Sequence, residues 1–276
     1  MTMTSLNETM RKTIRDRNSL VCVGLDYHPD KIPPHLKEKT DPIFSFNKAI
    51  IDATADLVCA YKPNLAFYEA FGSEGWDALE RTIRYIPHGI VKIGDAKRGD
   101  IGSTAAKYAD ALFRIGFDVV TVNPYLGMDS VSPFIEDPAK GVFILCLTSN
   151  PSSKDFQYRD INGRPLYLHV AEKVRAWNKK DNCGLVAGAT HPDELKRIRE
   201  IAPDLPFLIP GIGAQGGDLE SAIQWGTDTQ NSMAIINSSR GILYASSGPD
   251  FAEAARAETQ KLRDRINTII QGTTST

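Results

Sequence analysis

The sequence contains no long apolar run and no excess of one charge. None of its apolar stretches approaches the ~20 residues that a membrane-spanning helix needs, and the segment from Met1 to Arg17 lacks the apolar core of a signal peptide. The 276 residues include 32 basic and 34 acidic side chains, so the net charge is only −2. This balance argues against nucleic acid or an anionic membrane surface as a partner. We therefore expect a soluble, cytoplasmic protein.

Cysteine and histidine are scarce as well. The four cysteines are widely spaced along the chain, and the five histidines show no spacing such as H-x-x-x-H. A disulfide framework and a zinc site are therefore not expected, and no metal is predicted. The cysteines are read as small buried apolar residues of a protein in a reducing compartment. They are Cys22, Cys59, Cys146 and Cys183.

The glycine fingerprint of dinucleotide-binding sheets, G-x-G-x-x-G after the first strand, is missing too. The first apolar run leads instead into Gly24-Leu25-Asp26-Tyr27-His28-Pro29. This disfavours a doubly wound open sheet, which stays the alternative to a barrel.

What the sequence does contain is a series of eight short apolar runs, rich in Val, Ile and Leu and without clean alternation. Such runs are typical of parallel strands buried on both faces. Helical patterns lie between most of them, for example at Ser103–Ile115, where the apolar residues share one face. The pattern predicts an α/β fold, a single (β/α)8 TIM barrel over residues 1–276 with a core from about 18 to 270. The runs are Leu20–Leu25, Leu57–Tyr61, Ile90–Gly94, Asp118–Val122, Val142–Leu147, Gly184–Gly188, Phe207–Pro210 and Met233–Asn237.

Two predicted loops are longer than the others. Ser149–Pro165 follows the fifth run, and the glycine-rich Gly211–Asp218 follows the seventh. Both would lie on the face where a barrel keeps its active site, and long loops there are often lids.

The most informative motif is Asp95-Ala96-Lys97-Arg98-Gly99-Asp100, directly after the third apolar run. It places two carboxylates and a lysine at the carboxyl end of a predicted strand. Desolvating an unpaired charge costs several kcal/mol, so these charges are expected to be paired or functional. An exposed turn with solvated charges is the alternative for the motif taken alone.

Polar residues recur where the other predicted strands end. Each one alone could be a turn former or a surface charge, but in a barrel they would all converge on one pocket. Glycine amides and a guanidinium after the last two strands are suited to bind a phosphate. The residues are Asp26, Lys62, Ser149 with its neighbours Thr148 and Asn150, the segment Pro210-Gly211-Ile212-Gly213-Ala214-Gln215-Gly216-Gly217, and Arg240-Gly241.

Taken together, these motifs resemble orotidine 5′-phosphate decarboxylases, in particular their longer bacterial branch. The resemblance rests on the Asp95-x-Lys97-x-x-Asp100-Ile101-x-x-Thr104 pattern with the strand-end residues above, and it covers nearly the whole chain. It implies a cofactor-free, homodimeric barrel that converts orotidine 5′-phosphate to UMP and carbon dioxide, the last step of de novo pyrimidine synthesis.

The resemblance also implies a role for each matching residue. Lys62, Asp95, Lys97 and Asp100 would form an alternating charged array, with Asp100 and Thr104 reaching the partner subunit's site. Asp26 and Lys62 would bind the ribose hydroxyls, and Ser149 would contact the pyrimidine ring, with Thr148 and Asn150 as alternatives. Pro210, Gln215, Arg240 and the backbone around Gly241 would hold the substrate at its phosphate end.

The reaction explains why these residue types are needed. Loss of carbon dioxide from C6 of a pyrimidine leaves a carbanion without an adjacent electron sink. The Lys97 ammonium would stabilise that charge and then donate a proton to the carbon. Asp95 and Asp100 would flank Lys97 and keep it charged and oriented.

Three alternatives share parts of this pattern. Related barrels decarboxylate or cleave sugar phosphates with Mg²⁺, but they carry an acidic metal ligand where this chain has Lys62. A non-catalytic phosphate-binding barrel would be expected to lack one member of the array. A tryptophan- or histidine-pathway barrel would share only the phosphate loops, and fold alone would not separate these classes.

Overall fold

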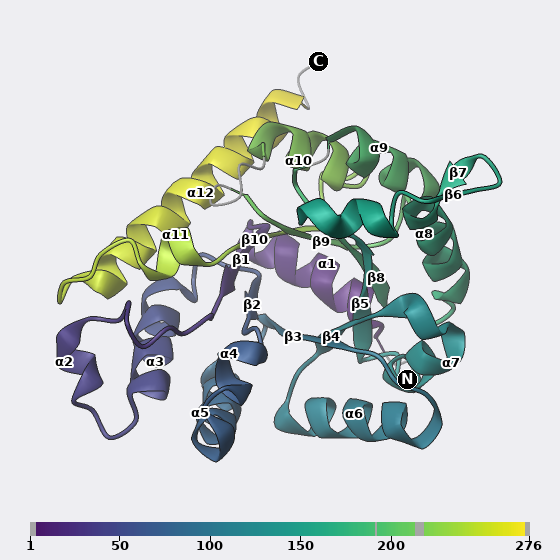
Figure 1. Cartoon of the computed structure of the whole chain (residues 1–276). Helices are drawn as coiled ribbons and strands as arrows, with labels where there is room; N and C mark the ends of the chain where they lie inside the picture. Colours follow the sequence, from purple (N-terminus) through teal and green to yellow (C-terminus); the bar gives the residue numbers. More distant parts are fainter. Residues whose placement is uncertain (1–3, 191, 213–217, 274–276) are drawn as a thin grey trace.

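The computed structural model describes residues 4–190, 192–212 and 218–273, and it forms a closed barrel of eight parallel strands. Around the barrel the strands follow the order β1-β10-β9-β8-β5-β4-β3-β2, so neighbours along the chain are neighbours in space apart from the small sheet β6–β7 (Figure 1). This confirms the predicted (β/α)8 fold. Each of the eight apolar runs overlaps one barrel strand, because strands covered on both faces need continuous apolar sequence. The barrel strands are β1 Val21–Gly24, β2 Ala60–Lys62, β3 Val91–Arg98, β4 Val119–Val122, β5 Gly141–Leu147, β8 Cys183–Ala187, β9 Phe207–Pro210 and β10 Ala234–Ser238.

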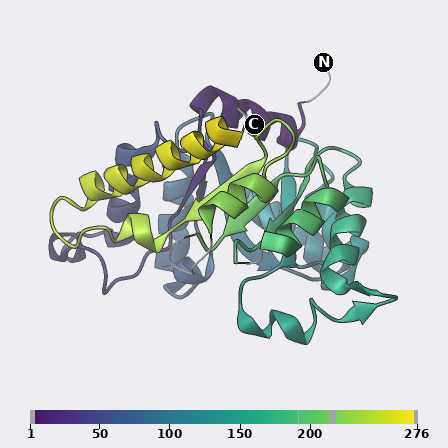
Figure 2. The ribbon, with the colours of Figure 1, turned by 90° about the horizontal axis from the view of Figure 1, so that it is seen from above.

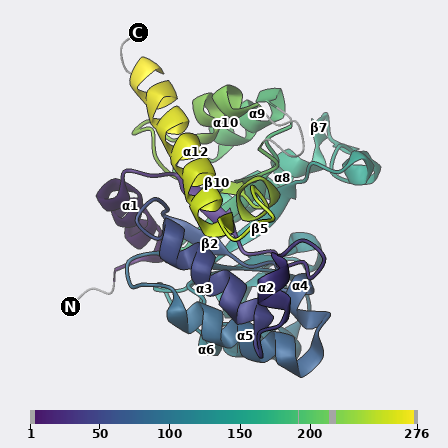
Figure 3. The ribbon, with the colours of Figure 1, turned by 90° about the vertical axis from the view of Figure 1, so that its left-hand side faces the viewer.

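Helices surround the barrel. The predicted helix Ser103–Ile115 is α6, Gly102–Ile115, which ends at Gly116 with a φ of 117°. The long C-terminal helix α12 packs against α3 and α10 and crosses the outside of the barrel (Figure 3). No helix among the described residues is both long and apolar enough to cross a membrane. The helices are α1 Leu6–Arg17, α2 Pro34–Lys37, α3 Pro42–Thr54, α4 Ala66–Glu69, α5 Gly72–Tyr85, α6 Gly102–Ile115, α7 Met128–Val131, α8 Leu166–Trp177, α9 Pro192–Ile201, α10 Leu219–Gly226, α11 Arg240–Leu243 and α12 Phe251–Thr273, with 3-10 turns η1 Pro124–Leu126, η2 Ser132–Phe134 and η3 Pro151–Asp155.

Helix α1 covers the amino end of the barrel. It starts with a capping box in which the side chains of Ser5 and Glu8 each bind the other's backbone amide. The Leu6 amide donates to the Pro138 carbonyl at 2.8 Å, and the Asn7 side chain donates to the carbonyl of Cys183, the first residue of β8, at 3.3 Å. Leu6 and Met10 belong to the same buried cluster as the barrel core, so the core extends to residues ahead of 18.

The segment between β5 and α8 departs from the repeating pattern. It contains the turn η3 and a two-stranded antiparallel hairpin, β6 Asp160–Ile161 with β7 Arg164–Pro165. This hairpin extends away from the barrel beside α8 (Figure 2).

Candidate active site

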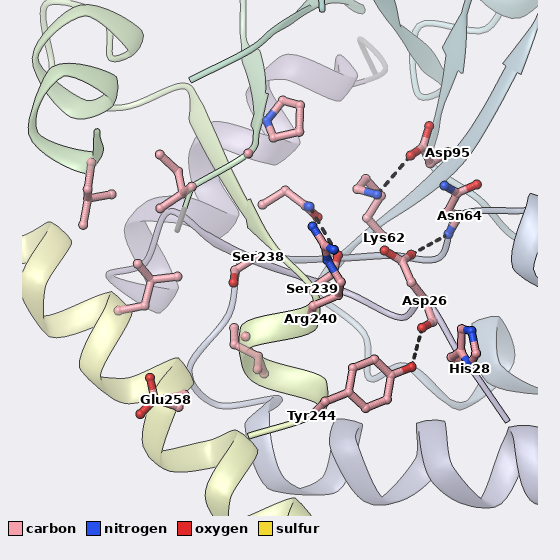
Figure 4. A pocket seen from close by; sticks show the side chains of 18 of the residues that line it. Asp26, His28, Lys62, Asn64, Asp95, Ser238, Ser239, Arg240, Tyr244 and Glu258 are labelled. Atoms are coloured by element: carbon pink, nitrogen blue, oxygen red, sulfur yellow. Dashed lines mark hydrogen bonds and ion pairs between the residues drawn. The ribbon is translucent and has the colours of Figure 1, made fainter. Parts of the chain in front are cut away.

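A cavity of about 810 Å³ opens at the carboxyl end of the barrel. It is lined by the ends of β1, β2, β3, β9 and β10 and by residues of α11 and α12 (Figure 4). The carboxyl ends of the strands meet at this face because all eight strands are parallel. Helix α1 covers the opposite end of the barrel. Of the residues predicted from the sequence, those that line the cavity are Asp26, Lys62, Asp95, Pro210, Arg240 and Gly241.

Asp95 lies between two lysines. Its Oδ2 is 3.1 Å from Lys62 Nζ, and its Oδ1 is 2.6 Å from Lys97 Nζ. The Thr121 hydroxyl on β4 donates to the same Oδ1 at 3.0 Å and accepts from the Lys97 amide at 2.9 Å. The Lys62 and Asp95 side chains are only 5% and 12% exposed, whereas Lys97 is 49% exposed. The buried part of the array therefore holds Asp95 in place, and Lys97 is the member accessible to a ligand.

The backbone of β3 creates this arrangement. The sequence predicted that the strand ends at Gly94, but β3 continues to Arg98, so Asp95 and Lys97 are part of the strand. Hydrogen bonds from the Asp95 amide to the Pro63 carbonyl and from the Asn123 amide to the Arg98 carbonyl keep this extension in the sheet. The pairing with β4 is irregular between Gly94 and Arg98, and Lys97 has a φ of 48°. A positive φ at a residue other than glycine costs on the order of 1 kcal/mol or more. At Lys97 this backbone conformation occurs together with a side chain directed back to Asp95.

The array is charged at neutral pH. Burial by itself raises the pKa of Asp95, but the ammonium groups of Lys62 and Lys97 lower it from 3.8 to about 2. Burial also lowers the pKa of Lys62, and the carboxylates of Asp95 and Asp26 outweigh that effect and raise it above its ordinary value. Opposite charges at short range favour the ionised form of both partners.

The rest of the cavity separates into two parts. Near Lys62, the Asp26 carboxylate accepts from the Asn64 amide at 3.2 Å, and the Tyr244 hydroxyl donates to the Asp26 carbonyl at 2.7 Å (Figure 4). At the ends of β9 and β10, Arg240 is exposed and has no carboxylate within ion-pair distance in the described part of the chain. A Cβ at Gly24 would lie 1.9 Å from Ser239 Oγ, so this glycine lets the end of β10 approach β1. The unpaired guanidinium of Arg240 is suited to bind an anion.

Four predicted residues that the structure describes are not among those that line the cavity: Lys97, Asp100, Thr104 and Ser149. Asp100 is half-buried and accepts from the Ile101 amide at 2.8 Å instead of pairing with Lys97, and Thr104 is exposed on the first turn of α6. Ser149 is half-buried directly after β5. Gln215 lies outside the described residues.

Sequence reasoning missed Thr121, Asn64 and Tyr244. The signal for Thr121 was a polar residue in the apolar run of β4, and it is 1% exposed in the structure. Asn64 and Tyr244 bind Asp26 through a backbone amide and a hydroxyl, and nothing in their local sequence indicates this. His28 and Lys31, to which no role had been assigned, also line the cavity.

Fold and site together define a (β/α)8-barrel enzyme with a lysine–aspartate–lysine array at the carboxyl end of its strands. Comparison with known proteins specifies the family. The family model described as "Orotidine 5′-phosphate decarboxylase / HUMPS family" matches residues 19–257, and the chain belongs to this family. It is 51% identical to the orotidine 5′-phosphate decarboxylase of a Roseiflexus species over 96% of this chain and 98% of that protein. The enzyme of the same name from Ralstonia nicotianae is 53% identical, over 91% and 93%.

Two solved structures are similar to this chain in fold. The OMP decarboxylase of Leishmania donovani superimposes with a TM-score of 0.81 at 40% identity, over 95% of this chain and 99% of that chain. The UMP synthase of the same organism superimposes with a TM-score of 0.87 at 41% identity, and this chain spans 57% of its length.

Proposed function

We propose that this protein decarboxylates orotidine 5′-phosphate to UMP and carbon dioxide, with Lys97 as the proton donor. The observation that carries this is the Lys62–Asp95–Lys97 array beside the cavity, in a chain about half identical to orotidine 5′-phosphate decarboxylases. A metal-dependent relative would need an acidic metal ligand at the end of β2. Here the end of β2 provides the ammonium of Lys62, which is buried between Asp26 and Asp95 (Figure 4).

The chemical step needs only groups of this array. The bond between C6 and the carboxylate breaks, carbon dioxide leaves, and the electron pair stays on C6. Lys97 Nζ, held 2.6 Å from Asp95 Oδ1, stabilises the developing carbanion and transfers a proton to it. The neutral amine then takes a proton from water, so no cofactor is required.

The remaining residues bind the substrate away from C6. Asp26 and Lys62 face the ribose hydroxyls, and Ser149 contacts the pyrimidine ring. Arg240, the backbone at Gly241 and the segment after Pro210, which includes Gln215, hold the phosphate. Binding energy from the phosphate would assemble the site around the reacting carbon.

We further propose a homodimer in which Asp100 and Thr104 complete the partner subunit's site. Asp100 forms no hydrogen bond or ion pair with Lys97 of its own chain, and it precedes Ile101, one of several exposed apolar residues that follow β3 and β4 and are here called the apolar patch. Tyr125 is 82% exposed and Ile101 55%, and several exposed apolar side chains on neighbouring segments are typical of an interaction surface. The patch consists of Ile101, Tyr108, Tyr125, Leu126 and Met128.

A mixing experiment tests the shared site. Lys97→Ala and Asp100→Ala variants are each expected to be nearly inactive, and subunit exchange between them should restore about one quarter of wild-type activity, because half of randomly formed symmetric pairs are hybrids with one intact site of two. The matched control mixes Lys97→Ala with Asp95→Ala, which lie in the same chain's array and should not complement. Equal recovery in both mixtures, or none in either, would contradict a site shared between subunits.

The activity itself is tested by the ultraviolet absorbance loss of orotidine 5′-phosphate with wild-type protein and EDTA. Rapid loss is expected, since no step uses a metal. An unchanged spectrum would reject the proposed reaction. Turnover of a sugar phosphate on addition of Mg²⁺ would then identify the metal-dependent alternative.

A further inference from the structure

The side chain of Gln157 attaches the insertion between β5 and α8 to the end of β5. Gln157 Oε1 accepts from the Thr148 amide at 2.8 Å, and Gln157 Nε2 donates to the Thr148 hydroxyl at 2.8 Å. That hydroxyl in turn donates to Asn150 Oδ1 at 2.6 Å. The three bonds fix the backbone and the side chains on both sides of Ser149.

Gln157 is itself held by rigid elements. Its amide donates to the carbonyl of the buried Ser153 at 2.8 Å, and its carbonyl accepts from the amide of Tyr167 in the first turn of α8 at 3.0 Å. The next residue, Tyr158, packs edge-on against the Tyr167 ring at 5.5 Å and donates to Glu194 of α9 at 3.1 Å. The insertion is therefore anchored to two helices of the barrel.

The residue that follows β8, Gly188, also packs closely against Ser149. The Gly188 amide donates to the Leu147 carbonyl at 2.9 Å. A Cβ at Gly188 would lie 3.2 Å from both the Ser149 nitrogen and its Cβ. The close approach of Gly188 and the Gln157–Thr148 hydrogen bonds at the preceding residue thus both restrict the Ser149 backbone.

We propose that Gln157 is a positioning residue for the pyrimidine ring: through Thr148 it sets the position from which Ser149 contacts the base. The inference rests on the proposed function, in which Ser149 meets the ring. It gives the insertion the role of a fixed platform that supports Ser149. Small displacements of a positioning group cost much in rate and binding, because hydrogen bonds to the ligand depend on geometry.

The test compares ligands with and without a pyrimidine. Gln157→Met keeps the length of the side chain and removes both hydrogen bonds to Thr148. Calorimetry should show UMP binding weakened about tenfold, the loss of roughly one ligand hydrogen bond, while ribose 5-phosphate binding stays within about twofold. Thr148→Val should act in the same direction, and Thr148→Ser, which keeps the hydroxyl, should restore wild-type UMP binding. Gln224→Met, at an exposed glutamine of α10, is the matched control and should change neither ligand.

A fall in affinity for both ligands together, or a lowered Tm with unchanged ligand preference, would overturn the inference in favour of a purely structural brace. Unchanged UMP binding in Gln157→Met would also overturn it. Failure of the wild-type protein to bind UMP is a different result, and it would reject the proposed function instead.

Discussion

Lys97→Ala is expected to lower kcat for orotidine 5′-phosphate decarboxylation by at least about 10⁴-fold, because it removes both the proton donor and the charge that stabilises the carbanion. The Lys97 side chain is 49% exposed, and among the described residues its Nζ bonds only to Asp95. The barrel should therefore stay folded, with a Tm close to that of the wild type. Single-turnover absorbance measurements and thermal unfolding of the same preparation provide both quantities.

Two further variants make the result specific. Lys92→Ala, at the other lysine of β3, should keep nearly full activity, since Asp95 pairs with Lys62 and Lys97 and not with Lys92 among the described residues. Lys97→Arg keeps the positive charge but is a poor proton donor, because the guanidinium pKa is above about 12. It should recover only part of the loss. Near-normal turnover in Lys97→Ala would exclude Lys97 as the donor.

Asp95→Ala is expected to abolish activity and also to destabilise the protein by about 3–5 kcal/mol, since removing one partner of a buried pair leaves the other charge uncompensated. The uncompensated group would be Lys62, whose side chain is 5% exposed and 3.1 Å from Asp95. Urea unfolding measures the free-energy change. Asp118→Asn, in a more exposed pair with Lys140 at 3.3 Å, is the matched control and should cost less than about 1 kcal/mol. Equal losses in the two variants would contradict the special role of burial.

The same pair predicts a pH dependence of stability. The pKa of Asp95 is lowered from 3.8 to about 2 in the folded state, so its contribution is fully present above about pH 4 and is lost as the pH falls towards 2, an effect of order 2 kcal/mol. The raised pKa of Lys62 means that its contribution persists up to its ordinary pKa and declines only in alkali above it. In the Asp95→Asn variant, the loss of stability that Asp95 causes between pH 4 and pH 2 should be absent. An unchanged slope there would show that other carboxylates dominate acid unfolding.

Much of the fold and half of the site could be predicted from local sequence. The eight apolar runs identified the barrel strands because burial on both faces demands continuous apolar residues. The carboxyl ends of parallel strands meet at one face, so residues placed after those runs, such as Asp26, Lys62 and Arg240, were expected together and are found lining one cavity. Periodicity and position along a strand are local properties, and a linear pattern contains them.

The hydrogen bonds that orient these residues depend on how distant segments pack. Thr121 bridges Asp95 and the Lys97 backbone only because the irregular pairing of β3 with β4 brings it there. The extension of β3 beyond Gly94 depends on the Pro63 and Asn123 backbone for the same reason. Gln157 reaches Thr148 because its own backbone is fixed by Ser153 and Tyr167. The sequence by itself determined the strands, the charged motif and the face on which they meet. Tertiary structure alone decided which distant partners Asp95, the Lys97 backbone and Thr148 take, because each of these hydrogen bonds requires a distance near 3 Å between groups far apart in the chain.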